Sequence, residues 1–245
     1  MAPSTILCER CGYDLTDLEH RLAGDAASPC PECGKPIAES LPERREGSAW
    51  QRGRSIGPWM ATHARTLRGP RSRWAEVRAE RGTGVALALA TCGVVGAAWG
   101  AVVAMSHTVP YRARGLEAGI GVGLLAAAAA WAVLLALCGI ERAGLLFYAR
   151  RHGWRTTPAV AWSVIGHASI GWASAPIIAA AIDSLAGEYI NAAPISWTGQ
   201  RMWESWVLLF VMGPLIAGML GFETLVYIGW RAMRYANHPR AAYSG

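Results

Sequence analysis

The chain has 245 residues, of which 53% are hydrophobic and only 16% are charged, and its formal net charge is +6. Soluble domains carry about 25% charged residues, and 24 of the 40 charged residues of this chain lie in residues 1–82. These numbers exclude an ordinary soluble globular enzyme, a disordered chain and a disulfide-rich secreted scaffold. They predict an all-α polytopic membrane protein, a four-helix transmembrane bundle with a small N-terminal domain.

The first 40 residues contain four of the six cysteines, in the sequences Cys8-Glu-Arg-Cys11-Gly and Cys30-Pro-Glu-Cys33-Gly. Two thiolates three positions apart in a tight turn can bind the same metal ion and supply two of its four tetrahedral ligands. The glycine that follows allows a positive φ. The spacing between the two pairs matches that of zinc-binding sequences. We therefore predict a zinc ribbon over residues 1–40, with one structural Zn²⁺ bound by Cys8, Cys11, Cys30 and Cys33.

Other chemistries are open to the same thiolates. Iron is the alternative metal, whereas a disulfide is disfavoured in a reducing cytoplasm. A thioredoxin-type redox role needs one C-x-x-C beside a βαβ unit, which the sequence does not predict. Because four thiolates close a tetrahedral shell and leave no position for a substrate, we expect the metal to be structural rather than catalytic.

The charge of the ribbon bears on its partners. Residues 1–34 carry a formal balance of −4 before any metal binds. Nucleic-acid binding needs a basic face, so this acidity disfavours nucleic acid. Two interpretations stay open: an unidentified cytoplasmic protein is the partner, or the ribbon only caps the structure. The N-terminus lacks a basic leader and an apolar core of about 7–15 residues, which predicts that the ribbon stays in the cytoplasm.

Residues 41–82 form a basic segment that we expect to be a linker with interfacial amphipathic helices rather than a packed domain. Within 44–81 there are ten arginines and three glutamates. Trp59, His63 and Leu67 recur every four residues and so share a helical face. We predict that this segment lies on the anionic inner leaflet; the alternative is a solvated charge run that only sets topology. The arginines predicted to contact lipid are Arg65, Arg68, Arg71, Arg73, Arg78 and Arg81.

Residues 83–230 contain long apolar runs that predict transmembrane helices over 84–105, 118–140, 158–182 and 206–230. Each run has 22–25 residues, and a spanning helix needs about 20. Counted on alternate sides of the spans, 13 arginines flank one side and three the other. The positive-inside rule then predicts an integral protein of the inner membrane with both termini, including the tail 231–245, in the cytoplasm.

Two polar residues inside the spans are candidates for function. Glu223 lies about 10 Å inside the boundary near Trp230, and His167 lies about 14 Å inside the boundary near Pro158, at 1.5 Å per helical residue. We predict a hydrogen bond between Glu223 and His167, with either a structural role or a role in proton transfer. Pro176 and Pro214 are expected to kink the third and fourth spans.

Two parts of the chain resemble known families. Cys8-Glu-Arg-Cys11-Gly-Tyr-Asp-Leu together with Cys30-Pro-Glu-Cys33-Gly resembles the rubredoxin-like zinc ribbon that opens many bacterial proteins. The remainder, with Trp154-Arg-Thr-Thr-Pro158-Ala-Val-Ala-Trp and His167-Ala-Ser-Ile-Gly-Trp172, is similar to the Yip family of multi-span membrane proteins. This similarity implies action through protein partners without catalysis. The chain departs from that family in its number of spans, because the family has five and the sequence predicts four.

The functional hypothesis is a non-enzymatic integral membrane adaptor or scaffold that presents a cytoplasmic zinc ribbon to a protein partner. The sequence contains no metalloprotease, serine hydrolase, Walker or dinucleotide motif. The alternative is a small transporter or channel that uses Glu223 and His167 in the membrane. A polar cavity at the midplane favours transport, whereas a solid apolar bundle favours the adaptor.

Overall fold

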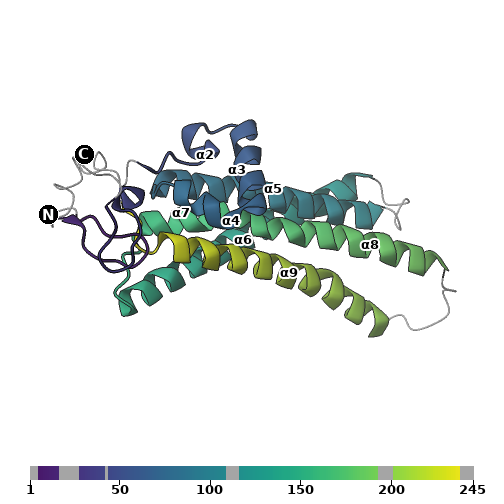
Figure 1. Cartoon of the computed structure of the whole chain (residues 1–245). Coiled ribbons are helices and arrows are strands. Elements are labelled where there is room, and N and C mark those ends of the chain that lie inside the picture. Colours follow the sequence, from purple (N-terminus) through teal and green to yellow (C-terminus); the bar gives the residue numbers. More distant parts are fainter. Residues whose placement is uncertain (1–4, 17–27, 42–43, 109–115, 193–200, 238–245) are drawn as a thin grey trace. The chain divides into compact units, whose positions relative to one another are not determined.

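The computed structural model describes residues 5–16, 28–41, 44–108, 116–192 and 201–237. This part of the chain is helical (Figure 1). Its extended pairing is limited to isolated bridges between Leu7 and Asp14 and between Pro29 and Pro36. Within the described residues, four helices are long and apolar enough to cross a membrane. The predicted fold class, an all-α polytopic membrane protein with a cysteine cluster near its N-terminus, is therefore confirmed.

Short connections join the helices in the first third of the chain. The N-terminal segment that carries the four cysteines, called the ribbon below after the prediction, ends in a 3₁₀ turn, η1 (Ile37–Ser40). Three short helices follow before the long ones. The helices are α2 (Ala49–Arg52), α3 (Ile56–Arg68), α4 (Pro70–Glu76), α5 (Arg81–Thr108), α6 (Leu116–Arg151), α7 (Pro158–Ala168), α8 (Ser174–Ala192) and α9 (Arg201–Met233).

The candidate spans cover Arg81–Met105, Gly119–Arg151, Pro158–Leu185 and Met212–Met233. Several helices continue beyond the apolar runs predicted from the sequence. The clearest case is α6, which continues from Ile140 to Arg151. Alanine, leucine, glutamate and arginine in this extension are good helix formers. An apolar run marks the part of a helix suited to lipid, whereas the helix itself ends where its backbone hydrogen bonds end.

The third span is broken rather than continuous. α7 passes into a 3₁₀ segment, η4 (Ser169–Ala173), before α8 begins at Ser174. Pro176 lies in the first turn of α8, where a missing backbone N–H breaks no helical hydrogen bond. The irregularity therefore precedes this proline. Pro214 lies inside the continuous helix α9.

The chain divides into two compact units. The first unit contains residues 1–88, 139–168 and 225–245, and the second contains residues 89–138 and 169–224. In the first unit the chain of α5 approaches α7 closely, since a Cβ built on Gly166 would collide with the backbone of Gly84. The fully buried side chains of this unit include Trp74, Val77, Val160 and Ile165.

The second unit is also held by close contacts between small residues. A Cβ on Gly100 would meet the backbone of Gly123 and the side chain of Ala127. A Cβ on Gly171 in η4 would collide with the backbone of α9 at Gly221 and Phe222. Side chains larger than hydrogen would separate these helices, as in other membrane bundles with small residues at their interfaces.

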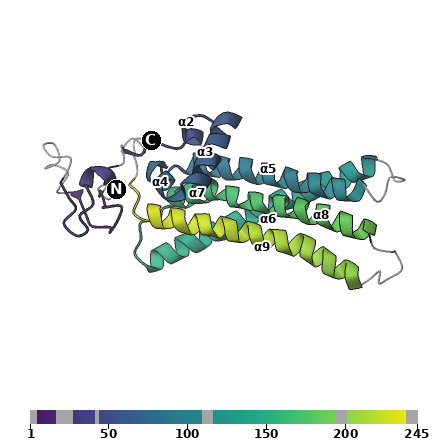
Figure 2. The same cartoon turned by 45° about the vertical axis from the view of Figure 1, so that its right-hand side comes forward.

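Residues 44–80 are packed, contrary to the expectation of a linker. Ser48 caps α2 in a capping box with Gln51, and the amide of Gln51 then pairs with the backbone of Arg78 through two hydrogen bonds, of 2.8 Å and 3.0 Å. α2 packs on α3, and α3 packs on both α4 and α7 (Figure 2). Trp50 and Trp74 are buried and supply the apolar surface of this packed segment. The many arginines in the sequence had suggested a segment without a core. This segment is an integral part of the first unit.

Candidate metal centre

The two cysteine pairs occupy two similar turns. In the first turn the amide of Gly12 donates to the carbonyl of Cys8 at 2.8 Å, and in the second the amide of Gly34 donates to the carbonyl of Cys30 at 2.9 Å. Both glycines have positive φ, 81° and 70°, a conformation that strains residues with a side chain. The Cys-x-x-Cys-Gly spacing therefore has the local structure that the sequence predicted.

The tips of the two turns bring all four thiols together. The Sγ atoms of Cys8, Cys11, Cys30 and Cys33 lie within 4.8 Å of one another. Cys8 Sγ is 3.5 Å from Cys33 Sγ, and Cys11 Sγ is 3.7 Å from Cys30 Sγ. These separations suit the edges of a tetrahedron with metal–sulfur bonds of about 2.3 Å. The four cysteines are free of disulfides and form a cluster that can bind one metal ion.

The surroundings of the thiols differ. Burial raises the pKa of Cys11 to about 12. Burial also acts to raise the pKa of Cys8, but backbone hydrogen bonds from Cys11 and Arg10 offset it and lower that pKa to about 7. Four thiolates so close together repel one another, so a cation is needed to hold all of them ionised.

The apolar core of the ribbon is small. It consists of Ile6, Leu15 and Ile37 with the buried thiols of Cys8 and Cys30. A domain of about 40 residues or fewer rarely folds on such a core without a metal, a disulfide or a partner. The ribbon therefore depends on its thiol cluster and on its contacts with the rest of the first unit.

The ribbon is attached to the chain that follows α9 by Asn237. The amide of Leu7 donates to Asn237 Oδ1 at 3.0 Å, and Asn237 Nδ2 donates to the carbonyls of Leu7 at 2.8 Å and Ser40 at 2.7 Å. Asn237 is only 2% exposed. Its amide satisfies the backbone of Leu7 in the way a neighbouring strand would.

A buried ion pair makes a second attachment. Glu9, between the first two cysteines, is 8% exposed and accepts from Arg45 Nε at 2.8 Å. Arg45 is 3% exposed, and its Nη1 donates to the carbonyls of Trp74 at 2.9 Å and Val77 at 2.7 Å, where α4 ends. Because these carbonyls have no partner inside α4, the guanidinium both caps the helix and holds the ribbon.

Aromatic and cationic side chains complete the attachment. Tyr235 lies against Gly12, where an added Cβ would be 2.8 Å from its ring. The guanidinium of Arg234 lies 5.1 Å from the ring centre of Trp154 and donates to the carbonyl of Arg10 at 3.2 Å. Arg155 donates to the carbonyl of Thr5. None of these contacts follows from spacing in the sequence, because the partners are at least 80 residues apart.

The predicted lipid-binding arginines divide into several groups. Arg65, Arg68 and Arg81 are exposed, Arg78 is half-exposed with its Nε donating to the carbonyl of Arg45 at 2.7 Å, and the side chain of Arg71 lies outside the described residues. The prediction for Arg73 is wrong.

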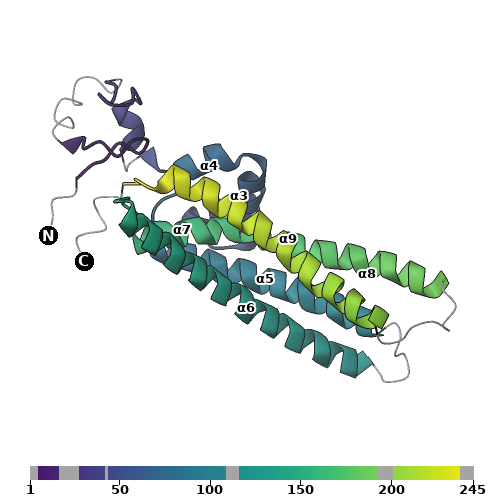
Figure 3. The same ribbon diagram turned by 90° about the horizontal axis from the view of Figure 1, so that it is seen from below.

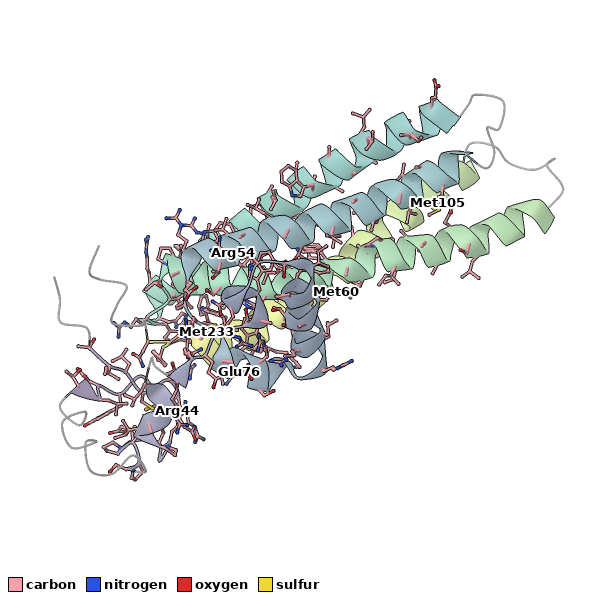
Figure 4. The ribbon with its side chains drawn as sticks, turned by 90° about the horizontal axis from the view of Figure 1, so that it is seen from above. Arg44, Arg54, Met60, Glu76, Met105 and Met233 are labelled. Atoms are coloured by element: carbon pink, nitrogen blue, oxygen red, sulfur yellow. The ribbon has the colours of Figure 1, made fainter. Side chains whose placement is uncertain are left out.

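Arg73 is 2% exposed and forms an ion pair with Glu76 (labelled in Figure 4). Burial lowers the pKa of its guanidinium. Arg73 adjoins Trp74, whose ring lies 2.5 Å from the position of a Cβ on Gly229 of α9. The short helix α4, which carries both residues, lies beside α9 (Figure 3).

The structure does not contain the predicted hydrogen bond between His167 and Glu223. His167 is fully buried, and its Nδ1 lies 2.7 Å from the carbonyl of Ser163, one helical turn earlier. Its Nε2 has no hydrogen-bond partner within the described residues. The ring instead makes an edge contact with Trp74 at 5.8 Å between centroids. Counting residues from the end of each span predicted similar depths for the two side chains in the membrane, but it did not predict the direction in which each side chain points.

Comparison with models of protein families, with curated proteins and with solved structures found no match. The resemblances to the rubredoxin-like ribbon and to the Yip family therefore stay hypotheses. The assignment of a metal centre rests on the geometry of the thiols.

Proposed function

We propose that the protein is a non-enzymatic membrane scaffold that binds one structural Zn²⁺ at Cys8, Cys11, Cys30 and Cys33 and presents the ribbon to a cytoplasmic protein. The observation that carries the proposal is the fixed position of the cluster within the first unit. Asn237 holds the ribbon by a buried hydrogen bond to Ser40 and two partly buried ones with Leu7, and Arg45 holds it by a buried hydrogen bond to Glu9. A rigid mount suits a surface that is presented for recognition, since binding then costs little ordering entropy.

The face available to a partner is the second turn. The first turn is contacted by Tyr235 and Arg234. The second turn exposes Glu32, and nothing lies within 4 Å of a Cβ placed on Gly34. Four thiolates and one Zn²⁺ add a charge of −2, so this face favours a partner with a basic surface.

The test compares two ribbon variants with the wild type after purification from membranes in mild detergent. Glu32→Arg reverses the charge of the exposed turn without touching the core, and Cys33→Ser removes a metal ligand. The scaffold function predicts that both lose a protein retained by the wild type, and that Glu32→Arg keeps its metal. Recovery of the same proteins with all three would contradict the proposal.

A second candidate function, transport, is favoured by the broken third span. In the second unit η4 packs backbone to backbone on α9 at Gly221 and Phe222, next to Glu223. Irregular backbone beside an acidic side chain is the arrangement in which transporters place coupling ions. Under this alternative, Glu223→Gln abolishes function at normal membrane abundance. Under the scaffold proposal the same substitution is silent, because the amide keeps an acceptor and adds donors.

A further inference from the structure

Helix α3 has its polar side inward and its apolar side outward. Ile56, Met60 and Leu67 are 79%, 60% and 60% exposed, and spacings of four and seven residues place them on one face, here called the α3 stripe. The buried side of the helix carries Thr62 and His63, at 0% and 3% exposure, and His63 adjoins the stripe. A helix on the surface of a soluble protein has the reverse arrangement.

Specific contacts fix this orientation. Thr62 Oγ1 accepts a hydrogen bond from the backbone amide of Trp50 of α2 at 2.9 Å. The hydroxyl of the buried Thr66 is satisfied within α3, where it donates to the carbonyl of Thr62 at 2.9 Å. Turning the stripe inward would break the hydrogen bond between Trp50 and Thr62 and would expose the side chains that α3 now buries, so α3 cannot hide the stripe by rotation.

The neighbours of α3 belong to the candidate spans. α3 packs on α7, the first part of the span Pro158–Leu185 (Figures 1 and 2). His167, which contacts Trp74 of α4, lies about 14 Å along α7 from Pro158, at 1.5 Å per residue. Through Trp74, the following helix α4 contacts His167 and Gly229, which lies in the fourth candidate span. α3 and α4 thus lie alongside the spans and not beyond their ends.

Cationic residues border the stripe. Arg65 and Arg68 in the last turn of α3 and Arg54 before its first turn are exposed. Long arginine side chains extend their guanidinium groups to lipid phosphates while their methylene groups stay in apolar surroundings. An apolar stripe between exposed arginines therefore matches the chemistry of an anionic lipid leaflet.

We propose that α3 is embedded in the leaflet at the ribbon end of the spans, with the α3 stripe among the acyl chains. Arg54, Arg65 and Arg68 contact the phosphates of anionic lipids. Figure 4 labels Met60, which lies on the lipid-facing side in this arrangement, and Arg54. The role of α3 is independent of the scaffold function, because it concerns the lipid contact of the first unit and not the partner of the ribbon.

The test places a fluorophore on α3 in the full-length protein, reconstituted in vesicles of phosphatidylcholine and phosphatidylglycerol. Met60→Cys is labelled with a nitrobenzoxadiazole dye. Leu125→Cys, 74% exposed on α6, is the control for a lipid-facing span, and Glu39→Cys in η1 is the control for water. The protein without added cysteine, labelled in parallel, gives the background from its native thiols.

We expect the dye on Met60→Cys to be quenched by lipids spin-labelled near the headgroup end of the chain and protected from aqueous iodide several-fold relative to Glu39→Cys. A dye that behaves as it does on Glu39→Cys, quenched by iodide but not by the spin-labelled lipid, would overturn the proposal. Vesicles of phosphatidylcholine alone test whether the arginines contact anionic lipid. Without phosphatidylglycerol, quenching by the spin-labelled lipid should fall at residue 60 but not at residue 125. Equal quenching in both vesicles would remove the phosphate contact from the proposal.

Discussion

The side chain of Asn237 pairs with both backbone polar groups of Leu7, accepting from the amide at 3.0 Å and donating to the carbonyl at 2.8 Å. Two residues that are 230 positions apart thus join the first cysteine turn to the chain that leaves the fourth span. The ribbon is therefore part of the first unit and is not suspended on a flexible linker.

Replacement of Asn237 by alanine should loosen the ribbon. The change leaves the amide of Leu7 and the carbonyls of Leu7 and Ser40 without their partner, and each unsatisfied buried group costs about 1–3 kcal/mol. Hydrogen exchange of the Leu7 amide should accelerate by about tenfold or more, since tenfold corresponds to about 1.4 kcal/mol. Glu39→Ala, an exposed change in the same ribbon, should leave the rate unchanged. Equal rates in the wild type and Asn237→Ala would show that this pair does not fix the ribbon.

The Glu9–Arg45 pair should be more sensitive to single than to double substitution. Glu9→Gln alone leaves the buried charge of Arg45 without its counterion, and breaking a buried pair in this way typically costs about 3–5 kcal/mol. Arg45→Met alone leaves the buried Glu9 with only Lys35 as counterion, at 3.9 Å. The double variant removes both charges, so we expect its free energy of unfolding to lie above that of Arg45→Met alone. Thermal unfolding in detergent measures the cycle. Strictly additive losses would mean that the two charges do not interact.

The sequence predicts the cysteine cluster and the spans, but it does not predict how individual polar side chains are buried. The four-cysteine cluster and the spans follow from local spacing and from apolar length, and both could be predicted. The burial of Arg73 could not be predicted from the sequence. Arginines recur throughout this segment without a helical period, so the sequence does not distinguish the buried Arg73, next to Trp74, from the exposed arginines. The direction of His167 likewise depends on its contact with Trp74, which joins α4 to α7 across 93 residues of chain.

Acid should destabilise the packing of α3. Burial and, to a smaller extent, the nearby His167 of α7 lower the pKa of His63 to about 3. Between pH 3 and the unfolded pKa of about 6.5, the unfolded chain binds the proton more tightly, so the stability present above about pH 6.5 is lost as the pH falls. From pH 7 to pH 5 the loss attributable to His63 is about 2 kcal/mol, at 1.4 kcal/mol per pH unit.

The measurement for His63 is thermal unfolding at pH 7 and pH 5 in the wild type and in His63→Gln. The variant removes one titrating group and leaves the others, so the difference between the two proteins isolates His63. We expect the variant to lose less stability on acidification. A variant that loses as much as the wild type would show that His63 is not held neutral by its burial.

The close approach of α4 to α9 should not tolerate an added methyl group. A Cβ at Gly229 would lie 2.5–2.8 Å from atoms of the Trp74 ring, whereas nothing lies within 4 Å of one at Gly144 of α6. Gly229→Ala should therefore destabilise by about 1–3 kcal/mol through overpacking. Gly144→Ala, the matched control in a helix, should be neutral or stabilise by up to about 1 kcal/mol. The same melting temperature in both variants would contradict the packing of Trp74 on Gly229.

The metal content of the purified full-length protein tests the central claim most directly. Elemental analysis of protein prepared without chelators should find one zinc ion per chain, and Cys8→Ser or Cys30→Ser should lose it, because a site with three thiolates binds zinc less tightly and the small ribbon core depends on the metal. The spans of these variants should still insert. Protein with intact thiols and no bound metal would contradict the account, and stoichiometric iron in place of zinc would overturn the assignment of the ion.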